Sequence, residues 1–254
     1  MSPSKIFLVL PAYNEEENLA ALLAAAQQVL SGEGRGYEVI LVDDGSHDGT
    51  LALAEDWAGR MPIRIVRHAV NQGLGPTLRD GLRAASGAAS DSDTIVAMDA
   101  DNTHPPELAV PMARLIDEGH DIVIASRYQA GARVEGVSAF RRMLSWGANS
   151  LFRAAFPIPG VQDYTCGFRA YRGGLLRKAF DHYGDDLVSE AGFQSTPDLL
   201  LKLARFAPVA TEIPLDLRYD RKRGASKMRI AKTIVRTLGL IVRRRFGERN
   251  REVG

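Results

Sequence analysis

The sequence predicts an α/β fold with a mostly parallel central sheet and helices on both faces of that sheet. Two observations support this prediction. Short apolar runs alternate with longer stretches in which apolar residues recur at helical spacing. The alternation holds through five consecutive runs, and such a strand–helix order is typical of parallel sheets, where each crossover carries a helix.

The five apolar runs are expected to form buried strands, because each is a short apolar stretch between polar segments. They are Ile6–Leu10, Val39–Val42, Ile63–Val66, Thr94–Met98 and Asp121–Ala125. In open parallel sheets ligands bind beyond the carboxyl ends of the strands. We therefore expect the segments that follow these runs to hold the functional residues.

The first helix is expected between the first two runs. Its apolar residues share one face and are Leu19, Leu22, Leu23, Ala26 and Leu30. Asn14 is expected to be its N-cap, because asparagine is favoured at that position. The three glutamates that follow Asn14 suit the positive end of the helix dipole.

Three further helices are expected before the fifth run. One opens at Asp48-Gly49-Thr50, and the next covers Gly75–Ala85. The last begins at Pro105-Pro106 and is expected to have Thr103 as its cap, since proline is favoured in the first turn of a helix.

After Ala125 the alternation becomes less regular. The expected elements are, in order, a helix at Ala139–Phe156, a strand at Gly167–Tyr171, helices at Gly173–Tyr183 and Pro197–Phe206, a strand at Val209–Pro214 and a last helix at Lys227–Phe246. No internal repeat or linker divides the chain. We expect one large domain over residues 1–226 and a basic amphipathic helix with a tail over residues 227–254.

The composition excludes several classes of protein. Hydrophobic residues make up 45% and charged residues 25% of the 254, which is typical of a globular chain and excludes a disordered or collagen-like one. Cys166 is the single cysteine, so an internal disulfide is excluded and a reducing compartment is expected. The apolar run near the N-terminus is too short for a signal peptide. No stretch has the 18 or so apolar residues of a membrane-spanning helix.

The charge is distributed unevenly along the chain. Residues 218–254 contain 13 Lys/Arg and 3 Asp/Glu, a net charge of +10, whereas the rest contains 19 and 28, a net charge of −9. One interpretation is a solvated helix docked on the domain. The alternative is a surface for phosphate, membrane or nucleic acid. Aromatic residues are sparse in this segment and no nucleic-acid-binding module is visible, so we expect no nucleic-acid partner.

Polar turns follow three of the expected strands. They contain Asp43-Asp44-Gly45-Ser46, Asp99-Ala100-Asp101 and Ser126-Arg127-Tyr128. Each alone is compatible with an ordinary turn or a surface ion pair. Together they lie at one edge of the sheet, where paired carboxylates suit Mg²⁺ or Mn²⁺ with a diphosphate and an arginine suits phosphate. The Gly-rich signatures of dinucleotide-binding folds and of P-loops are absent from the sequence.

These segments, with Pro11–Glu15, resemble in order and interval the inverting GT-A glycosyltransferases of the large synthase-type family. Further segments resemble the dolichyl-phosphate (polyprenyl-phosphate) mannose synthases within it. They are Phe140–Arg142 with Gly147–Asn149, Asp163–Arg169, and Arg221–Lys227. The resemblance spans residues 5 to 246. It implies the GT-A fold and a transfer of hexose, foremost mannose from GDP-mannose, to a polyprenyl or dolichyl phosphate with inversion.

The resemblance also implies roles for single residues. The nucleoside of the donor would be held by Pro11, Tyr13, Glu15, Val42 and Asp44. The metal and the diphosphate would be held by Asp99, Ala100 and Asp101, with Thr103 as a weaker metal ligand. Donor or acceptor phosphates would be bound by Arg127, Arg221 and Lys227, which we count with Asp101 as the catalytic set. The cofactor would be Mg²⁺ or Mn²⁺.

The chemistry implied by the resemblance needs no serine or cysteine nucleophile. An acceptor phosphate is already anionic near neutral pH, so the protein has to stabilise charge on a diphosphate leaving group. The basic tail would hold the protein on the cytoplasmic face of a membrane, directly or through a membrane partner subunit. Three alternatives remain. They are a UDP-sugar donor such as UDP-glucose, a soluble acceptor, and a non-catalytic binding protein, against which the pair Asp99 and Asp101 argues.

Overall fold

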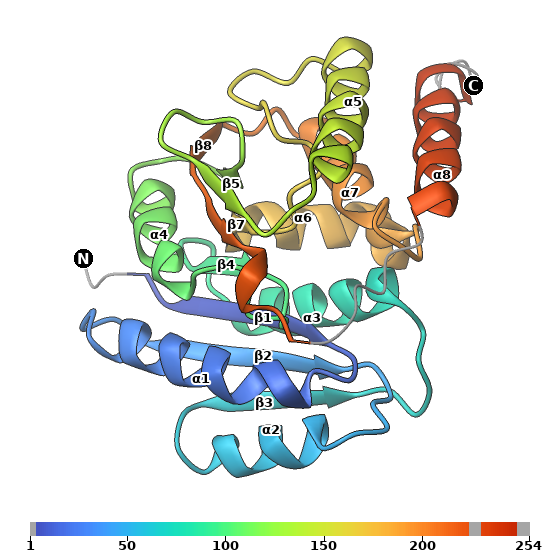
Figure 1. Ribbon diagram of the computed structural model, residues 1–254. Helices are drawn as coiled ribbons and strands as arrows, with labels where there is room; N and C mark the ends of the chain where they lie inside the picture. The colour runs from blue at the N-terminus through green and yellow to red at the C-terminus, as the bar shows by residue number, and fades with distance from the viewer. Residues whose placement is uncertain (1–3, 224–229, 248–254) are drawn as a thin grey trace.

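The computed structural model describes residues 4–223 and 230–247. A seven-stranded sheet runs through its centre in the order β3-β2-β1-β4-β7-β5-β8 (Figure 1). The strands are β1 Ile6–Ala12, β2 Tyr37–Asp43, β3 Ile63–Arg67, β4 Thr94–Ala97, β5 Ile122–Ser126, β7 Arg169–Arg172 and β8 Ala210–Pro214. All five runs that were predicted as strands are strands.

Six strands of the sheet run in the same direction, and β7 runs against them between β4 and β5. The mostly parallel sheet predicted from the sequence is therefore confirmed. Because β7 is antiparallel, the chain enters it at the edge where its parallel neighbours end. Residues 163–168 consequently lie at the same edge of the sheet as the turns after β4 and β5.

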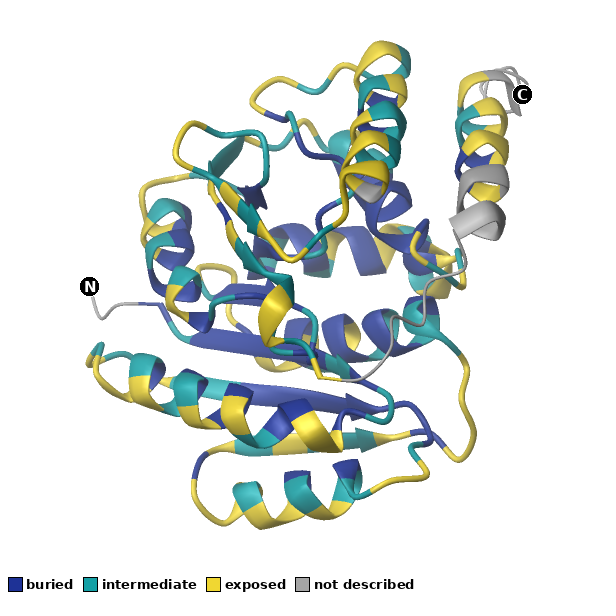
Figure 2. Ribbon diagram, viewed as in Figure 1, coloured by how far each residue is buried: buried dark blue, intermediate teal, exposed yellow. Residues whose placement is uncertain are grey.

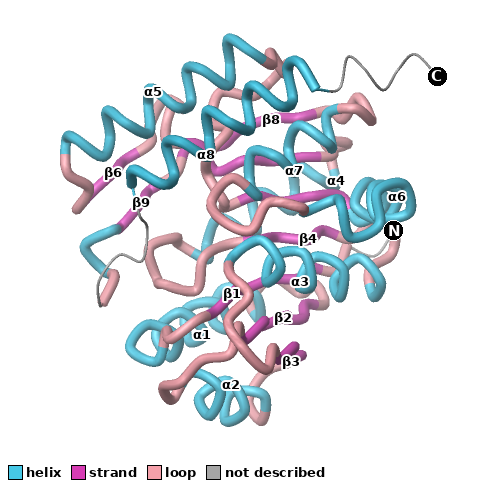
Figure 3. Tube along the Cα trace, turned by 90° about the vertical axis from the view of Figure 1, so that its right-hand side faces the viewer, coloured by secondary structure: helices cyan, strands magenta, loops and turns pink. Residues whose placement is uncertain are grey.

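Helices cover both faces of the sheet. They are α1 Glu16–Ser31, α2 Thr50–Ala58, α3 Leu74–Ala88, α4 Ala109–Asp117, α6 Gly173–Tyr183 and α7 Ser195–Ala204. Figure 3 shows α1 and α3 on opposite sides of β1 and β2. Gly81 lets α3 approach the sheet closely, because a Cβ atom at this position would lie 2.5 Å from Cγ1 of Val9 and 3.0 Å from Cγ2 of Val42.

The core lies on both sides of β1 and β2 (Figure 2). Ile6 to Leu10 are fully buried, as are Leu19, Leu22, Leu23 and Ala26 on the predicted apolar face of α1. β3 is different. It is an edge strand, its apolar residues are only partly buried and Arg64 and Arg67 are exposed, so the expectation of a buried strand is wrong there. Arg64 and Arg67 are three residues apart and therefore lie on opposite faces of the strand, so neither face of β3 is wholly apolar.

Two expected helix caps differ in the structure. Glu15, rather than Asn14, stands at the N-cap position of α1, and it makes no side-chain capping bond. Asn14 has a positive φ of 50°, and its Oδ1 accepts a hydrogen bond from the backbone N–H of His47. Thr103 caps no helix, because its hydroxyl donates to Asp101. The chain after it forms a short 3₁₀ turn, Pro106–Leu108, that leads into α4.

A second, two-stranded parallel sheet was not predicted. It pairs β6 Arg133–Glu135 with β9 Asp216–Arg218. Each strand has only three residues, too few for a period-2 pattern to be recognised. The sheet matters for function, because β9 leads directly into the 3₁₀ turn Tyr219–Arg221 and residues 222–223, which lie over the end of β4.

Helix α5 Ala139–Ala155 and helix α8 Ile230–Val242 contact each other beyond the sheet (Figures 1 and 3). The expected start of the last helix, Lys227, lies outside the described residues. A π-helical turn, Arg243–Gly247, continues α8, and Arg244 donates to the fully buried carboxylate of Asp198 in α7 at 2.7 Å. No helix in the described parts of the chain has the length and apolar character needed to cross a membrane.

Candidate active site

The turns after β1 and β2 are joined by hydrogen bonds. β1 lies between β2 and β4, so the three segments that follow these strands share one edge of the sheet. The backbone N–H of Asp44 donates to the carbonyl of Ala12 at 2.8 Å. The N–H of Asn14 donates to Oγ of Ser46 at 3.0 Å. The predicted nucleoside-binding segments therefore form one continuous surface.

Asp44 is buried and is held from three directions. Its Oδ1 accepts from the N–H of Gln72, and its Oδ2 accepts from the N–H of Gly73, each at 2.8 Å. The Nδ1 atom of His68 lies 2.7 Å from Oδ1. The other ring nitrogen of His68 lies 3.0 Å from Oδ2 of Asp80 in α3. No local sequence pattern indicates His68, because its two carboxylate partners are 24 and 12 residues away.

The other residues implied for the nucleoside differ in exposure. Pro11 and Tyr13 are partly exposed at the end of β1. Val42 is fully buried, and its side chain packs on α3 at Gly81, so only the backbone of Val42 can face a ligand at this edge. Glu15 is buried beside Asn18, whose Nδ2 donates to Oε2 of Glu15 at 2.8 Å.

Asp99 and Asp101 follow β4 and are close to one another. Oδ1 of Asp101 accepts from the N–H of Thr103 at 3.2 Å and from its hydroxyl at 2.7 Å. The backbone N–H of Asp99 donates to Nδ1 of His104 at 3.3 Å. Burial, together with the charge of Asp101, raises the pKa of Asp99. Ala100 is buried between the two carboxylates in the sequence.

Lys222 binds Asp101 and was not selected from the sequence. Its Nζ lies 2.5 Å from Oδ2 of Asp101, and each side chain is only 12% exposed. Burial alone would raise the pKa of Asp101, but the charge of Lys222 outweighs it, so this pKa lies below its ordinary value. Arg221, which the resemblance did select, is exposed. A lysine within a basic loop has many equivalent neighbours in the sequence, so no local pattern distinguishes Lys222.

The segment that carries Lys222 is fixed at both ends. The N–H of Arg218 donates to the carbonyl of Thr103 at 3.0 Å. The N–H of Arg223 donates to Oδ1 of Asn18 at 2.9 Å, and Nδ2 of Asn18 donates back to the carbonyl of Arg223 at 3.2 Å. This pair of bonds between α1 and residue 223 is called the Asn18 clip below. It holds the segment over the carboxylates.

The residues at this edge fit a divalent cation. Two carboxylates at one strand end supply the hard oxygen ligands that Mg²⁺ and Mn²⁺ prefer. Burial beside a second carboxylate raises the pKa of Asp99, so a cation bound there would stabilise its anionic form. Within the described residues no cluster of three or more His, Cys, Asp or Glu could hold a metal alone. The remaining ligands would therefore be phosphate oxygens and water, as is usual for Mg²⁺.

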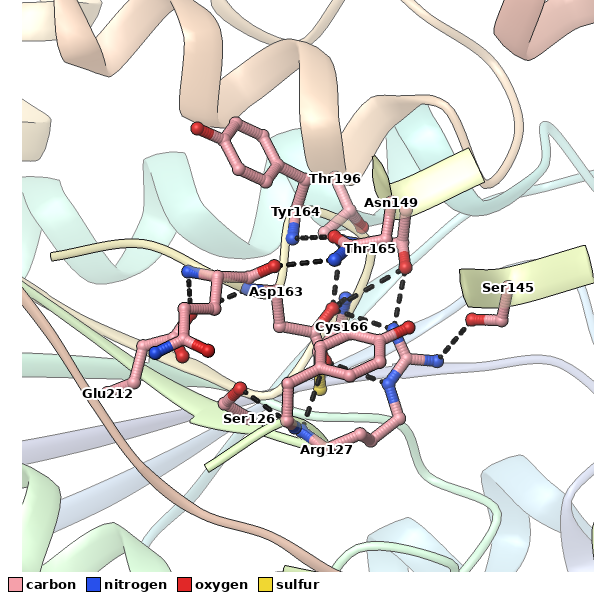
Figure 4. A network of polar contacts seen from close by, with 12 residues as sticks. Ser126, Arg127, Ser145, Asn149, Asp163, Tyr164, Thr165, Cys166, Thr196 and Glu212 are labelled. Carbon is pink, nitrogen blue, oxygen red and sulfur yellow. Dashed lines mark hydrogen bonds and ion pairs between the residues drawn. The ribbon is translucent and has the colours of Figure 1, made fainter. Parts of the chain in front are cut away.

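Arg127 lies in a second polar network, shown in Figure 4. Its Nε donates to Oδ2 of Asp163 at 2.8 Å, and its Nη2 donates to Oδ1 of Asp163 at 2.7 Å and to Oγ1 of Thr165 at 2.6 Å. Its Nη1 donates to Oγ of Ser145 in α5 at 2.9 Å. Burial alone would raise the pKa of the fully buried Asp163, but the charge of Arg127 lowers it below the ordinary value.

This network gives Arg127 partners other than the phosphates implied by the resemblance. Its guanidinium neutralises Asp163 and links the end of β5 to the Asp163–Arg169 segment and to α5. The resemblance includes both segments, and their mutual contact follows from the antiparallel placement of β7. Lys227, the remaining residue of the expected phosphate-binding set, lies outside the described residues.

Comparisons with known proteins agree with this architecture. Residues 7–180 match the family described as glycosyl transferase family 2. A dolichol-phosphate mannosyltransferase of Pyrococcus furiosus is 34% identical over 240 residues, which are 94% of this chain and 63% of that protein. A polyprenol monophosphomannose synthase of Mycolicibacterium smegmatis is 32% identical over 232 residues, 88% of this chain and 81% of that protein.

A solved structure shows the same fold. Glucosyl-3-phosphoglycerate synthase from Mycobacterium tuberculosis, crystallised with Mn²⁺, UDP and glucosyl-3-phosphoglycerate, superposes with a TM-score of 0.62 at 23% identity. The match covers 94% of this chain and 80% of that one.

Proposed function

The chain belongs to glycosyl transferase family 2, and we propose that it transfers mannose from GDP-mannose to a polyprenyl or dolichyl phosphate. One observation carries the choice of substrates. Two relatives that match most of this chain at 34% and 32% identity are named for mannose transfer to dolichol phosphate and for polyprenol monophosphomannose synthesis. Since the chain spans only 63% of the first relative, both substrates are part of the proposal.

The donor would bind across the ends of β1, β2 and β4. Pro11, Tyr13, Glu15 and the backbone of Val42 would face the nucleoside. Asp44 would shape this pocket by holding the Gln72–Gly73 turn, because three donors already bind its oxygens. The diphosphate would lie beside Asp99 and Asp101, where a bound Mg²⁺ or Mn²⁺ would offset the negative charge of the leaving group.

The transfer itself needs positioning and charge stabilisation. An oxygen of the acceptor phosphate forms a bond to the anomeric carbon of mannose while the bond from that carbon to the diphosphate breaks on the opposite face. GDP leaves with the electron pair, and the configuration inverts. Because the attacking oxygen is already anionic, no side chain has to remove a proton. Lys222, Arg221 and Lys227 would supply positive charge to the phosphates.

A lipid acceptor fits one exposed surface. Phe140, Met143 and Trp146 on α5 are between 58% and 62% exposed, and Leu238 and Val242 on α8 are also exposed. These five residues are called the apolar ridge below. The sequence predicts an amphipathic last helix. In the structure its apolar residues differ in burial, because Leu240 is buried whereas Leu238 and Val242 are exposed.

Basic residues flank the apolar ridge. Arg142, Arg153, Arg243 and Arg245 are exposed on the same two helices and the turn after them. An exposed apolar stripe with arginines beside it is typical of helices that lie on anionic lipid. The proposal therefore includes peripheral attachment to the cytoplasmic face of a membrane, through residues 227–254 and α5 together. A membrane partner subunit that covers the ridge is the alternative.

The proposal is tested by a transfer assay with the purified chain. GDP-mannose, UDP-glucose and UDP-N-acetylglucosamine are each supplied with Mg²⁺ or Mn²⁺, with and without a short polyprenyl phosphate. We expect mannosyl-phosphoprenol only from GDP-mannose. Transfer of glucose from UDP-glucose would mean that the donor is a UDP-sugar. Absence of transfer to the polyprenyl phosphate would exclude the proposed lipid acceptor. Asp101→Ala is expected to abolish transfer with the fold intact, whereas full activity of this variant would exclude the metal role.

A further inference from the structure

Lys222 occupies the carboxylate that a divalent cation would need. Both oxygens of Asp101 are engaged by donors of the chain itself, Oδ1 by Thr103 and Oδ2 by Lys222. The Thr103 bonds are local and orient the carboxylate. The Lys222 bond is made across 121 residues and supplies a full positive charge to a largely buried anion.

A divalent cation and Lys222 compete for Oδ2. A Mg²⁺-sized cation binds carboxylate oxygens at about 2.1 Å, which would place it within about 5 Å of the ammonium nitrogen on the same oxygen. Like charges at such a distance in a buried site repel each other strongly. Departure of Lys222 therefore favours binding of the cation at Oδ2 of Asp101.

We propose that Lys222 is an exchangeable counter-ion of Asp101, which a divalent cation displaces only when a nucleoside diphosphate binds with it. The proposal rests on the proposed function, because it takes the diphosphate site to be at Asp99 and Asp101. The displaced ammonium then has a new anionic partner, the diphosphate, so the two ligands assist each other's binding. Lys222 becomes a phosphate-binding residue of the loaded protein.

The surrounding structure permits this exchange. The Asn18 clip fixes the backbone at residue 223 to α1, and the Arg218–Thr103 bond fixes the chain on the other side. The exchange therefore requires rotation of the lysine side chain alone, and its four-carbon stem is flexible. Asp101, Glu15 and Asp99 are carboxylates near the ammonium, so an incoming diphosphate would compete with them for the same charge.

The test measures Mn²⁺ affinity rather than transfer. Free Mn²⁺ is quantified by electron paramagnetic resonance in titrations of the full chain, first without nucleotide and then with saturating GDP. Lys222→Gln removes the counter-ion, and Lys222→Met is a second variant of similar length. Lys178→Gln is the matched control, because it removes one positive charge from an exposed lysine of α6, outside the proposed site. Thermal unfolding verifies that each variant is folded.

Without nucleotide, we expect Lys222→Gln and Lys222→Met to bind Mn²⁺ about tenfold more tightly than the unmodified chain, and Lys178→Gln to stay within about threefold. Addition of GDP should strengthen Mn²⁺ binding far more in the unmodified chain than in the Lys222 variants. Equal Mn²⁺ affinity of the unmodified chain and both Lys222 variants would overturn the exchange, as would an equal gain in Lys178→Gln. If neither the unmodified chain nor any variant bound Mn²⁺ in the presence of GDP, the proposed donor site, and not the exchange of Lys222, would be excluded.

Discussion

At the scale of single residues, His68 contributes to the shape of the proposed donor pocket by holding Asp44. It lies between Asp44 and Asp80, and both ring nitrogens face a carboxylate oxygen. Asp44 in turn receives the N–H groups of Gln72 and Gly73. The turn beside the nucleoside-binding segments therefore depends on a buried imidazole that the sequence pattern did not indicate.

His68→Gln is expected to raise KM for the nucleotide-sugar about tenfold with little change in kcat, because loss of a hydrogen bond to a charged group costs about 1.5 kcal/mol. Asp80→Asn leaves the contact to Asp44 in place and should have a smaller effect of the same sign. Steady-state kinetics over a range of donor concentrations measure both. An unchanged KM in His68→Gln would show that Asp44 keeps its position without the imidazole.

Asp163 is expected to be a major source of stability. Asp163→Asn leaves the largely buried charge of Arg127 without its counter-ion, so the free energy of unfolding should fall by about 3 kcal/mol in urea denaturation. Asp56→Asn is the control. It breaks the Arg60–Asp56 pair, in which both side chains are 56% exposed, and should cost less than about 1 kcal/mol. Equal losses would contradict the special role of the buried pair.

The same pair predicts a dependence on pH. The pKa of Asp163 is lowered in the folded chain, so its contribution is fully present above the unfolded pKa near 4 and is lost as the pH falls through the lower folded value. The difference in unfolding free energy between the unmodified chain and Asp163→Asn should be constant from about pH 5 to 8. It should shrink below about pH 4. A difference in unfolding free energy that grew as the pH fell would contradict this prediction.

The sequence was most informative for residues at strand ends. Asp44, Asp99 and Asp101 could be selected because parallel strands deliver the segments that follow them to one edge. Lys222 and His68 could not, because each meets its carboxylate only through long-range folding. Arg127 was selected for phosphate, and the structure pairs it with Asp163, which is 36 residues away. An arginine that follows a strand has the same local sequence pattern whether it binds a phosphate or pairs with a carboxylate of the chain.

At the scale of secondary-structure elements, the strand–helix alternation predicted the sheet and the helices as far as β5. Beyond it the sequence predicted the elements at 167–171 and 209–214 but not the direction of β7, because an apolar run is the same in either direction. The short strands β6 and β9 were missed for lack of length. The antiparallel direction of β7 brings Asp163 to Arg127, and the strand β9 leads the chain to Lys222 and its contact with Asp101.

The packing of α3 on β1 and β2 gives a prediction with an internal control. Gly81→Ala would place a methyl group 2.5 Å from Cγ1 of Val9, so overpacking should cost about 1 to 3 kcal/mol. Gly87→Ala lies on the same helix with no atom within 4 Å of the new methyl group, and it should be neutral or stabilise by up to about 1 kcal/mol. Urea denaturation measures both. A neutral Gly81→Ala would mean that α3 can move away from the sheet.

At the scale of the whole molecule, the apolar ridge and the charge asymmetry both involve helix α8. The ridge lies on α5 and α8, and the strongly basic segment includes α8. The acidic remainder of the chain would be repelled by anionic lipid, so the two parts together favour one orientation on a membrane surface.

Flotation with anionic vesicles tests this orientation. Trp146→Ser with Met143→Ser should reduce the bound fraction severalfold, since each change removes an exposed apolar side chain from the ridge. Val209→Ser, an exposed apolar residue outside α5 and α8, should not change it. Raising the salt concentration should weaken binding through the arginines. Equal binding of all variants would show that the apolar ridge does not contact the lipid.

The outermost strand of the sheet affects how separate copies of the molecule meet. β3 has only one neighbour in the sheet, so its other side offers unpaired backbone groups to a strand from another copy. Arg64 and Arg67 are exposed on this strand, and Arg64 pairs with Glu38 of β2 at 2.8 Å. Charged side chains on an edge strand disfavour the edge-to-edge pairing that leads to aggregation, because that pairing would have to strip them of water. A protein concentrated on a two-dimensional lipid surface would benefit from such protection, because its copies meet there far more often than in bulk water.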